Sequence, residues 1–327
     1  MLKLLKKITL LLIVIFIALP LIAEVGSVGD LNEIGMGARV LGMGKAFVGI
    51  ADDSNSIFSN PAGLGSIHKM EVMSMKASLQ GDIDYLVLGG SLPLEIGTVG
   101  VGYIASTVDD IVLVSALNAN GRPVAGNSIS YKEQEVYVGY GMDILQSIRG
   151  LLDLDGALYL GANLKLFLKE ASGITDGQGT GLGADIGLLY APTDQFSIGI
   201  SQQNLSSQIS WQSGAKDDVQ GLTKIGMKLN ADKVLLGLDA DIAGSDQPVL
   251  LHGGVEWQVI PYLSVRGGVD QILEPQVSGS ANKAGVASNM TLGVGLQLMG
   301  VKLDYAYHPF YDEEDNLTHF VSLSYSK

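Results

Sequence analysis

The chain has 327 residues, of which 47% are hydrophobic and 17% charged, with 43 glycines, 9 prolines and no cysteine. A formal net charge of −14 argues against a nucleic-acid partner, which would need a basic surface. The lack of cysteine excludes disulfides, cysteine nucleophiles and cysteine-based zinc sites. A soluble domain carries about 25% charged residues, so this composition is typical of a membrane barrel or of a glycine-rich soluble β protein.

The N-terminus has the pattern of a secretory signal peptide. Three lysines among the first seven residues are followed by an apolar run from Ile8 to Ala23. This run is shorter than the ~20 residues that a helix needs to cross a bilayer, and Ala23 is a suitable last residue before a cleavage site. We expect residues 1–23 to be a cleaved signal peptide that exports the chain; an uncleaved anchor helix is the alternative.

Residues 24–70 precede the first expected strand, and we call this segment the hatch. Its stretch 35–64 starts rich in glycine but has no G-x-G-x-x-G loop between a strand and a helix, so it predicts no nucleotide site. Asp52 or Asp53 is suited to cap a short helix. Asn60–Pro61 should end that helix, because the residue before proline avoids the helical region.

From residue 71 onward, apolar and polar residues alternate. Between 158 and 168 every second residue is leucine or alanine, and lysine and asparagine stand among the others. Successive side chains of a strand point to opposite faces, whereas a helix needs apolar residues three and four apart. Most of the segments approach the 9–11 residues of a tilted membrane strand. About fourteen strands are expected, at 71–79, 84–92, 98–106, 134–143, 157–169, 180–191, 195–203, 222–230, 233–242, 249–259, 262–271, 287–298, 300–308 and 317–326.

The links between these segments alternate in length. Short links follow most even-numbered strands, and longer links follow several odd-numbered ones, at 107–133, 204–221, 272–286 and 309–316. Outer-membrane barrels have short periplasmic turns and long outer loops, so an even strand count places both chain ends in the periplasm. The link 144–156 departs from this rule, and its apolar spacing predicts a short amphipathic helix. Asn120–Gly121 predicts a small hairpin within 107–133.

With the leucine-rich faces toward lipid, the charged residues point into the barrel. We expect Lys224 near Asp239 and Glu256 near Arg266, since opposite charges on adjacent strands stabilise a sheet by roughly 0.2–1 kcal/mol. Pairing that merely fills the lumen is favoured over a tuned channel lining, because buried charges need partners for solvation alone. The predicted lumen-lining residues are Lys165, Lys224, Asp239, Asp241, Glu256, Arg266, Lys302 and Asp304.

The hatch carries a specific resemblance. The stretch from Gly37 to Phe47, the pair Asp52–Asp53 and the run Asn60–Leu64 are similar to the N-terminal signature of the FadL-like outer-membrane barrels, in particular the PorV/PorQ branch. This resemblance implies a fourteen-stranded barrel whose N-terminal segment folds into the lumen. A wall-anchoring turn explains Asn60–Leu64 without a ligand. The candidate hatch residues are Gly42, Gly44, Asp52, Asp53, Asn60, Pro61, Ala62 and Gly63.

Two features of the sequence depart from or refine this resemblance. Outer-membrane proteins commonly end in an aromatic residue, whereas this chain ends in Tyr325–Ser326–Lys327. Gly89–Gly90 is a candidate for a gap in the wall, because glycine weakens a strand interior. The expected fold is thus an all-β transmembrane antiparallel barrel of about 14 strands with a small N-terminal helical hatch, built from a hatch at 24–70 and a barrel at 71–327. A soluble β-sandwich is the alternative.

The resemblance implies transport of hydrophobic small molecules, such as long-chain fatty acids, across the bacterial outer membrane. A PorV-like part in type IX protein secretion and surface attachment is the second hypothesis, slightly favoured by the lack of a clearly apolar inward face, and a structural barrel is the third. Expected partners are outer-membrane lipid, a hydrophobic ligand, and secretion machinery or cargo. No enzyme is expected, since no G-x-S-x-G elbow is present, and neither a cofactor nor a metal site is expected.

Overall fold

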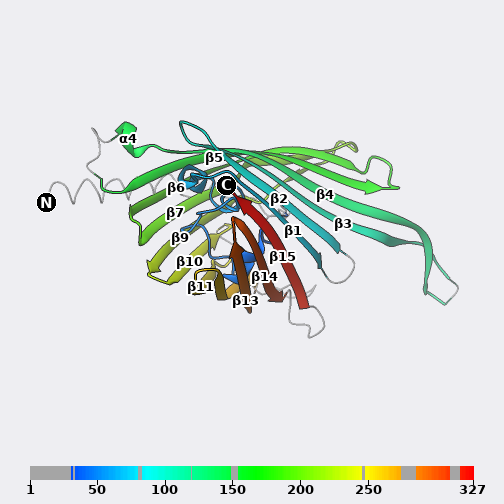
Figure 1. Ribbon diagram of the computed structural model, residues 1–327. Coiled ribbons are helices and arrows are strands. Elements are labelled where there is room, and N and C mark those ends of the chain that lie inside the picture. The colour runs from blue at the N-terminus through cyan, green and yellow to red at the C-terminus, as the bar shows by residue number, and fades with distance from the viewer. Residues whose placement is uncertain are drawn as a thin grey trace.

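The computed structural model describes residues 31, 34–79, 83–118, 120–148, 154–244, 247–273, 285–309 and 317–327. The expected signal peptide lies outside these residues. Antiparallel strands form a barrel around the hatch (Figure 1). The strands are β1 (Glu71–Leu79), β2 (Ile83–Pro93), β3 (Thr98–Leu117), β4 (Pro123–Asp143), β5 (Ala157–Ser172), β6 (Gln178–Thr193), β7 (Phe196–Trp211), β8 (Lys216–Asp218), β9 (Leu222–Ala231), β10 (Val234–Ile242), β11 (Leu250–Ile260), β12 (Leu263–Leu273), β13 (Val286–Leu298), β14 (Val301–Pro309) and β15 (Leu317–Ser326).

The sheet closes on itself. β1 pairs with both β2 and β15, and β6 pairs with both β5 and β7. β8 is a three-residue strand that, among the described residues, pairs with β7 alone, so it lies outside the ring. The ring therefore has fourteen strands, which confirms the expected barrel and excludes the β-sandwich. Each expected segment lies within or close to one of these strands.

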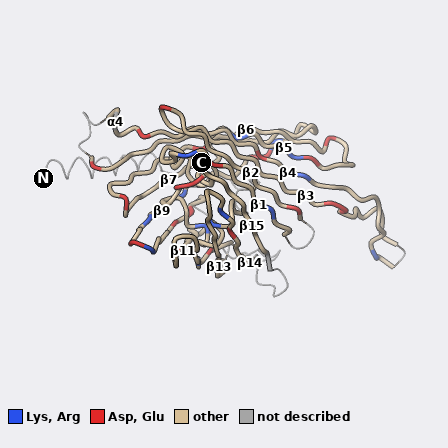
Figure 2. Tube along the Cα trace, viewed as in Figure 1, with Lys and Arg blue, Asp and Glu red and all other residues tan. Residues whose placement is uncertain are grey.

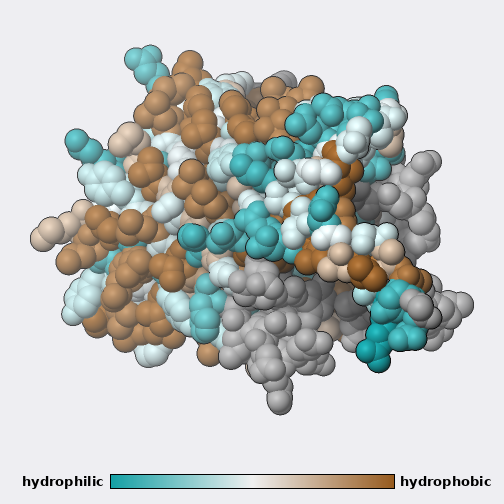
Figure 3. Space-filling model, turned by 90° about the vertical axis from the view of Figure 1, so that its right-hand side faces the viewer, coloured by the Kyte–Doolittle hydropathy of each residue, from teal (hydrophilic) through white to brown (hydrophobic). Residues whose placement is uncertain are grey.

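The alternating pattern separates an apolar outer face from a mixed inner face. Along β5, Asn163, Lys165 and Lys169 are buried inside the barrel, whereas Leu164 is 70% exposed on its outer face. Hydrophobic residues occupy much of the outline in Figure 3, and charged residues occupy only short stretches of the chain in Figure 2. An outward apolar band on a closed barrel is the surface that lipid requires, so this is a transmembrane barrel. Among the described residues, no helix is long and apolar enough to cross a membrane.

The two ends of the barrel differ. One end, which we call the turn end, carries tight links such as Asp232–Lys233 and Met299–Gly300, and Asp232, Met299 and Gly300 all have positive φ. The backbone nitrogen of Lys327 donates to the carbonyl of Met70, so β1 starts and β15 ends at this same end. The opposite end, which we call the loop end, carries the longer links. The expected alternation of link lengths holds for most of the links; the exceptions are the long link 144–156 at the turn end and the short links from β1 to β2 and from β3 to β4 at the loop end.

Two links differ from a plain loop. The expected loop 107–133 consists largely of extended β3 and β4, whose hairpin projects beyond the other strands at the right of Figure 1. Its tip is held by Asn118, whose Oδ1 accepts from the backbone nitrogens of Asn120 and Arg122. In the link 144–156, α4 (Leu145–Ile148) supplies the expected short helix, and its Leu145 is buried.

Between residues 34 and 70, the hatch forms three short helices inside the ring. These are α2 (Ala38–Gly42), α3 (Ser56–Ser59) and the 3-10 helix η2 (Pro61–Ser66). The residue before α3 is Asn55, so the expectation that Asp52 or Asp53 occupies the cap position is wrong. Asp53 instead accepts hydrogen bonds from Asn55 and shapes the turn that precedes the helix. Asn60 ends α3 as expected, and its side chain accepts from the nitrogen of Ala62.

Candidate functional site

One side of the lumen is apolar. The inward residues of β1 are Met73, Met75, Ala77 and Leu79, and all are buried. They belong to a buried cluster that includes the hatch residues Ile57, Phe58 and Leu64 and the wall residues Tyr85, Val87, Ile104, Tyr137 and Phe320. We call this cluster the apolar track. It extends from Leu79 near the loop end to Phe58, and the hatch residues Leu31, Met36 and Leu41 pack into it along its length. The expectation that the barrel lacks a clearly apolar inward face is therefore wrong.

The track ends on an aromatic contact between the hatch and the wall. The rings of Phe58 and Tyr137 meet edge to face, with centroids 5.1 Å apart. Gly89 makes room here, since a Cβ would come within 2.9 Å of Met73 and 3.5 Å of Phe58. β2 also pairs with both neighbours without a register shift through Gly90. The expected wall gap at Gly89–Gly90 is thus not present, and these glycines relieve crowding instead.

Register does shift between β6 and β7. Asn204 and Ser206 have positive φ, and the pairing slips on both sides of Ala184. The backbone nitrogen of Asn204 turns inward and donates to Asp185 Oδ1 at 2.9 Å. Lys165 Nζ lies 3.0 Å from the same carboxylate oxygen, so this predicted lumen residue braces an irregular part of the wall.

At the turn end, an ion-pair cluster ties the hatch to the opposite wall. Arg39 of α2 lies 2.5 Å from Asp52, 2.8 Å from Asp53 and 2.9 Å from Glu256 of β11. Glu256 also lies 2.5 Å from Arg266 of β12, as expected from the sequence. Two predicted hatch residues and two predicted lumen residues thus meet around one arginine that the sequence interpretation used only as part of the motif.

The wall side of this cluster extends through β14. Arg266 Nη1 lies 2.7 Å from Asp304, and Lys302 Nζ lies 3.7 Å from the same carboxylate. All three were predicted to face the lumen, and the structure places them there. Their charges alternate in sign, which is the arrangement that buried ionised groups require.

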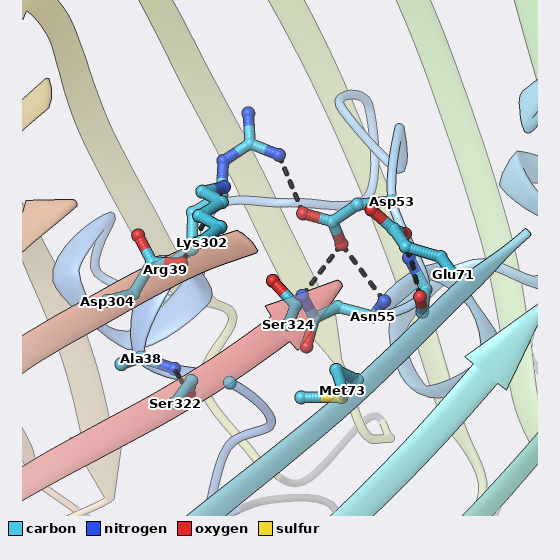
Figure 4. Close-up of a pocket in the computed structure, with 12 residues that line it drawn as sticks. Ala38, Arg39, Asp53, Asn55, Glu71, Met73, Lys302, Asp304, Ser322 and Ser324 are labelled. Atoms are coloured by element: carbon cyan, nitrogen blue, oxygen red, sulfur yellow. Dashed lines mark hydrogen bonds and ion pairs between the residues drawn. The ribbon is translucent and has the colours of Figure 1, made fainter. Parts of the chain in front are cut away.

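The electrostatics of the cluster favour its charged form. Burial alone disfavours the charge on Arg39, but Asp52, Glu256 and Asp53 outweigh it and raise the pKa of the guanidinium well above its ordinary value. Burial likewise acts to raise the pKa of Asp53, but Arg39 and Lys302 outweigh it and hold that pKa below its ordinary value. Figure 4 shows Arg39 and Asp53 pointing toward each other, with Asn55 hydrogen-bonded to Asp53 and Glu71 nearby on β1.

Two clefts open at the turn end beside this cluster. One, of about 350 Å³, is lined by Arg39, Glu256, Arg266 and the turn residues Asp232 and Lys233. The other, of about 530 Å³, is lined by Ile50, Tyr159, Leu189 and Gln195 among others. Asp52 and Lys228 line both clefts, so together they form a polar mouth below the hatch.

The remaining predicted residues hold the hatch against the wall. Asp239 Oδ2 accepts hydrogen bonds from the nitrogens of Phe47 and Val48 at 2.6 and 2.8 Å. The expected pairing of Lys224 with Asp239 is wrong, since Lys224 lies opposite Asp241 at 2.7 Å. The reason is the turn, which consists of residues 232 and 233 rather than 231 and 232, so each partner moves by two residues.

Small hatch residues fit closely against strands. Gly42 faces Gly293 of β13, and Gly44, at φ 59°, faces the backbone of Val269 on β12. Asn60 donates to the carbonyls of Val48 and Leu188, so it links two parts of the hatch with β6. Pro61 and Ala62 rest on wall glycines of β5 and β6, and Gly63 lies against Ala51. The role of Asn60–Gly63 in the structure is that of an anchoring turn.

A buried group of histidines and aspartates escaped the sequence interpretation. His252 Nδ1 lies 2.8 Å from Asp270 Oδ1, and His308 Nε2 lies 2.8 Å from Asp270 Oδ2. The three residues come from β11, β12 and β14, so no spacing along the chain reveals them. Among the described residues, no group of three or more His, Asp or Glu side chains is arranged to hold a metal ion.

These features define the class of protein: a closed transmembrane barrel of fourteen antiparallel strands, filled at one end by an N-terminal hatch. Its fold is that of the toluene transporter TodX of Pseudomonas putida, with a TM-score of 0.62 and 14% identity over 93% of this chain and 100% of that one. A FadL homologue of Pseudomonas aeruginosa matches with a TM-score of 0.56 and 11% identity, over 89% and 98% of the chains. No protein-family model and no curated protein sequence matches this chain.

Proposed function

We propose that this barrel carries small hydrophobic molecules across the bacterial outer membrane, after export by the N-terminal signal peptide. The observation that carries the proposal is the apolar track, which leads from the loop end to the hatch along the inner faces of β1, β2, β3 and β15. A polar pore would line this path with charges, whereas here methionine and aromatic side chains line it. The fold shared with a toluene transporter supports the same conclusion.

The track and the clefts divide the route into three steps. A hydrophobic molecule enters at the loop end, displaces the hatch residues Leu31 and Met36 that pack in the track, and reaches the contact between Phe58 and Tyr137. Onward passage requires a change in the hatch, because Arg39 and Asp239 hold it against the wall on the opposite side. Release is toward the two clefts at the turn end.

Uptake by whole cells tests this proposal. Cells with and without the protein, matched for outer-membrane integrity, are given a labelled long-chain fatty acid and, in parallel, labelled toluene. Saturable uptake of either compound that depends on the protein supports transport. Equal uptake of both compounds in the two strains, with the protein present at the outer membrane, would overturn the proposal.

A second candidate function, PorV-like participation in protein secretion, is favoured by the projecting hairpin. Beyond Val108 and Ser130 its two strands have no further partner strand among the described residues. Val112, Val114 and Leu117 are 56%, 62% and 66% exposed there. Exposed apolar residues on unpaired strand edges are typical of a protein-binding surface.

This second candidate has its own test. Residues 111–129 are replaced by an Asn-Gly turn, which shortens the hairpin to the length of its neighbours. Loss of specific proteins from the cell surface, with uptake of hydrophobic compounds unchanged, would support the secretion function. Unchanged surface proteins would exclude it.

A further inference from the structure

A chain of ionisable side chains runs along the inner wall from β9 to β14, where its last member, His308, meets the track residue Phe320 edge to face. Lys224 Nζ lies 2.7 Å from Asp241 Oδ2, and His252 Nε2 lies 3.3 Å from that same oxygen. His252 then continues the chain to Asp270, and His308 contacts the other oxygen of Asp270. Four wall strands besides β9 therefore contribute to one buried network that transport of an apolar molecule does not use.

The hatch joins this network through Lys45. Its Nζ lies 3.0 Å from Asp270 Oδ2, the oxygen that also contacts His308. Lys45 has φ 63°, a region that residues other than glycine rarely adopt. Gly44 beside it is pressed against the backbone of β12. A strained residue that makes a buried ion pair is typical of a functional contact.

The network lies toward the loop end of the barrel. Lys224 is near the start of β9 and Asp241 near the end of β10, and His308 is one residue from the end of β14. In this up-and-down topology all these strand ends belong to the loop end. The groups are thus closer to the outer medium than the Arg39 cluster is.

The charges around each histidine determine how the network responds to acid. His252 faces Asp239 and Asp241 of β10 and Asp270 of β12. His308 faces Asp270, Lys45 and, on β15, the ring of Phe320. With both histidines neutral, two lysines, Lys224 and Lys45, are set against three aspartates, Asp239, Asp241 and Asp270. Protonation adds two positive charges that compete with Lys45 for Asp270 and, from His308, repel it.

We propose that the Lys45–Asp270 contact is an acid-sensitive latch, which His252 and His308 release when the outer medium becomes acidic. Histidine is the side chain whose charge changes most readily near neutral pH, and its surroundings set where it does so. Release frees Lys45 and its neighbours from β12 and β14, while the Arg39–Glu256 pair and the Asn60–Gly63 turn keep the rest of the hatch attached to the wall. Only the consequence for transport rests on the proposed function.

Cysteine accessibility measures the latch directly, because the natural chain has no cysteine. Ala46 and Ala62 are both fully buried hatch residues, the first next to Lys45 and the second at the anchoring turn. Purified Ala46→Cys and Ala62→Cys proteins are treated with a small organomercurial, which reacts with thiols at acid pH. Rates between pH 7.5 and 5.5 are divided by the rate of Ser213→Cys, which lies in an exposed loop.

Acidification should raise the relative rate of thiol modification at position 46 by about tenfold, the change in an equilibrium that corresponds to one pKa unit. The rate at position 62 should stay unchanged. Adding His252→Gln and His308→Gln should abolish the response, whereas Lys45→Met should make position 46 reactive at both pH values. Heat-dependent migration in gels shows that each variant retains the folded barrel. A pH-independent rate at position 46, or a response that survives in the double glutamine variant, overturns the latch. A response in a barrel that carries no hydrophobic compound keeps the latch and rejects the proposed function.

Discussion

At the residue scale, transport along the apolar track requires apolar side chains at the positions that line it. Met75 is 1% exposed and lies in the middle of the track. Met75→Asn places an amide where a passing apolar molecule strips its water. Leaving such a group without hydrogen bonds costs about 1–3 kcal/mol, so uptake at low substrate concentration should fall by about tenfold or more.

The matched control for Met75→Asn is Thr223→Asn, on β9 in the polar side of the lumen. Thr223 is also buried, and its hydroxyl bonds to Gln202. Uptake should change little in this variant. Equal loss in both variants would show that any asparagine in the lumen blocks the route, and the track would have no special part.

Arg39 makes a different prediction, on stability. Arg39→Met leaves Asp53 and Glu256 without their shared partner. The free energy that attaches the hatch to the wall should fall by about 3 kcal/mol. This is the lower bound for breaking a buried ion pair, and it applies because the side chain of Asp52 is 40% exposed and stays solvated. The measurement is the denaturant concentration at which a protease cuts the hatch. Lys228→Met, a charge loss in the same mouth, should leave that midpoint unchanged.

The same cluster should make hatch attachment depend on pH. The pKa of Asp53 is lower in the folded protein than its ordinary value, because Arg39 and Lys302 outweigh the effect of burial. The stabilisation is therefore present above the unfolded-state pKa of about 3.9 and is lost as pH falls through the lower, folded value. Protease resistance of the hatch should drop below about pH 4, and Asp53→Asn should remove this dependence. A drop of equal size in Asp53→Asn would assign it to other carboxylates.

At the element scale, the hatch and the wall touch through glycines. A Cβ at Gly161 of β5 would collide with the backbone of Pro61. Gly161→Ala should therefore displace η2, since overpacking costs about 1–3 kcal/mol. The expected result is a rise in ion conductance of the barrel in planar bilayers.

Gly267→Ala on β12 is the control, because its Cβ would meet nothing nearer than the carbonyl oxygen of Thr291 at 3.9 Å. This barrel should conduct as little as the parent. Equal conductance of the two alanine variants would mean that the hatch tolerates displacement at η2 without leaking.

Strand positions were predictable from the sequence because each strand alternates between lipid and lumen, a local pattern with a period of two. Register was harder. The expected Lys224–Asp239 pair was wrong because the turn was placed one residue too early. In an antiparallel pair, moving the turn by one residue changes the partner of every residue by two positions. The hairpin expected around Asn120–Gly121 is present. Its continuity with β3 and β4 was not predicted, because residues 111–117 and 124–129 show no alternation of apolar and polar residues.

The residues of the site were predictable only where they lie close together in the sequence. The hatch motif lies within thirty residues, and its resemblance located Asp52, Asp53 and Asn60 correctly in the hatch. The apolar track and the His252–Asp270–His308 group assemble from several strands, and their members are separated by up to hundreds of residues. Inward parity identifies such residues one at a time, but closure of the ring decides which of them meet.

At the scale of the whole molecule, the two sides of the lumen differ in the residues that line them. The β1–β3 and β15 side offers an apolar path, and the β9–β14 side holds the hatch with ion pairs at two levels, around Arg39 and around Asp270. The two sides meet where His308 packs edge to face against Phe320. Because onward passage requires a change in the hatch, mutations in the track should alter entry, and mutations in the ion pairs should alter release.

The orientation of the whole barrel gives the last prediction. The export that we propose, together with β1 starting and β15 ending at the turn end, predicts that this end stays in the periplasm and that the long hairpin lies outside. An epitope inserted at the tip between Asn118 and Arg122 should be labelled by antibody on intact cells. The same epitope between Asp232 and Lys233 should be labelled only after the outer membrane is permeabilised, because this turn lies beside the clefts at the turn end. Labelling of the turn epitope alone on intact cells would invert the barrel, and with it the direction from the apolar track to the polar mouth.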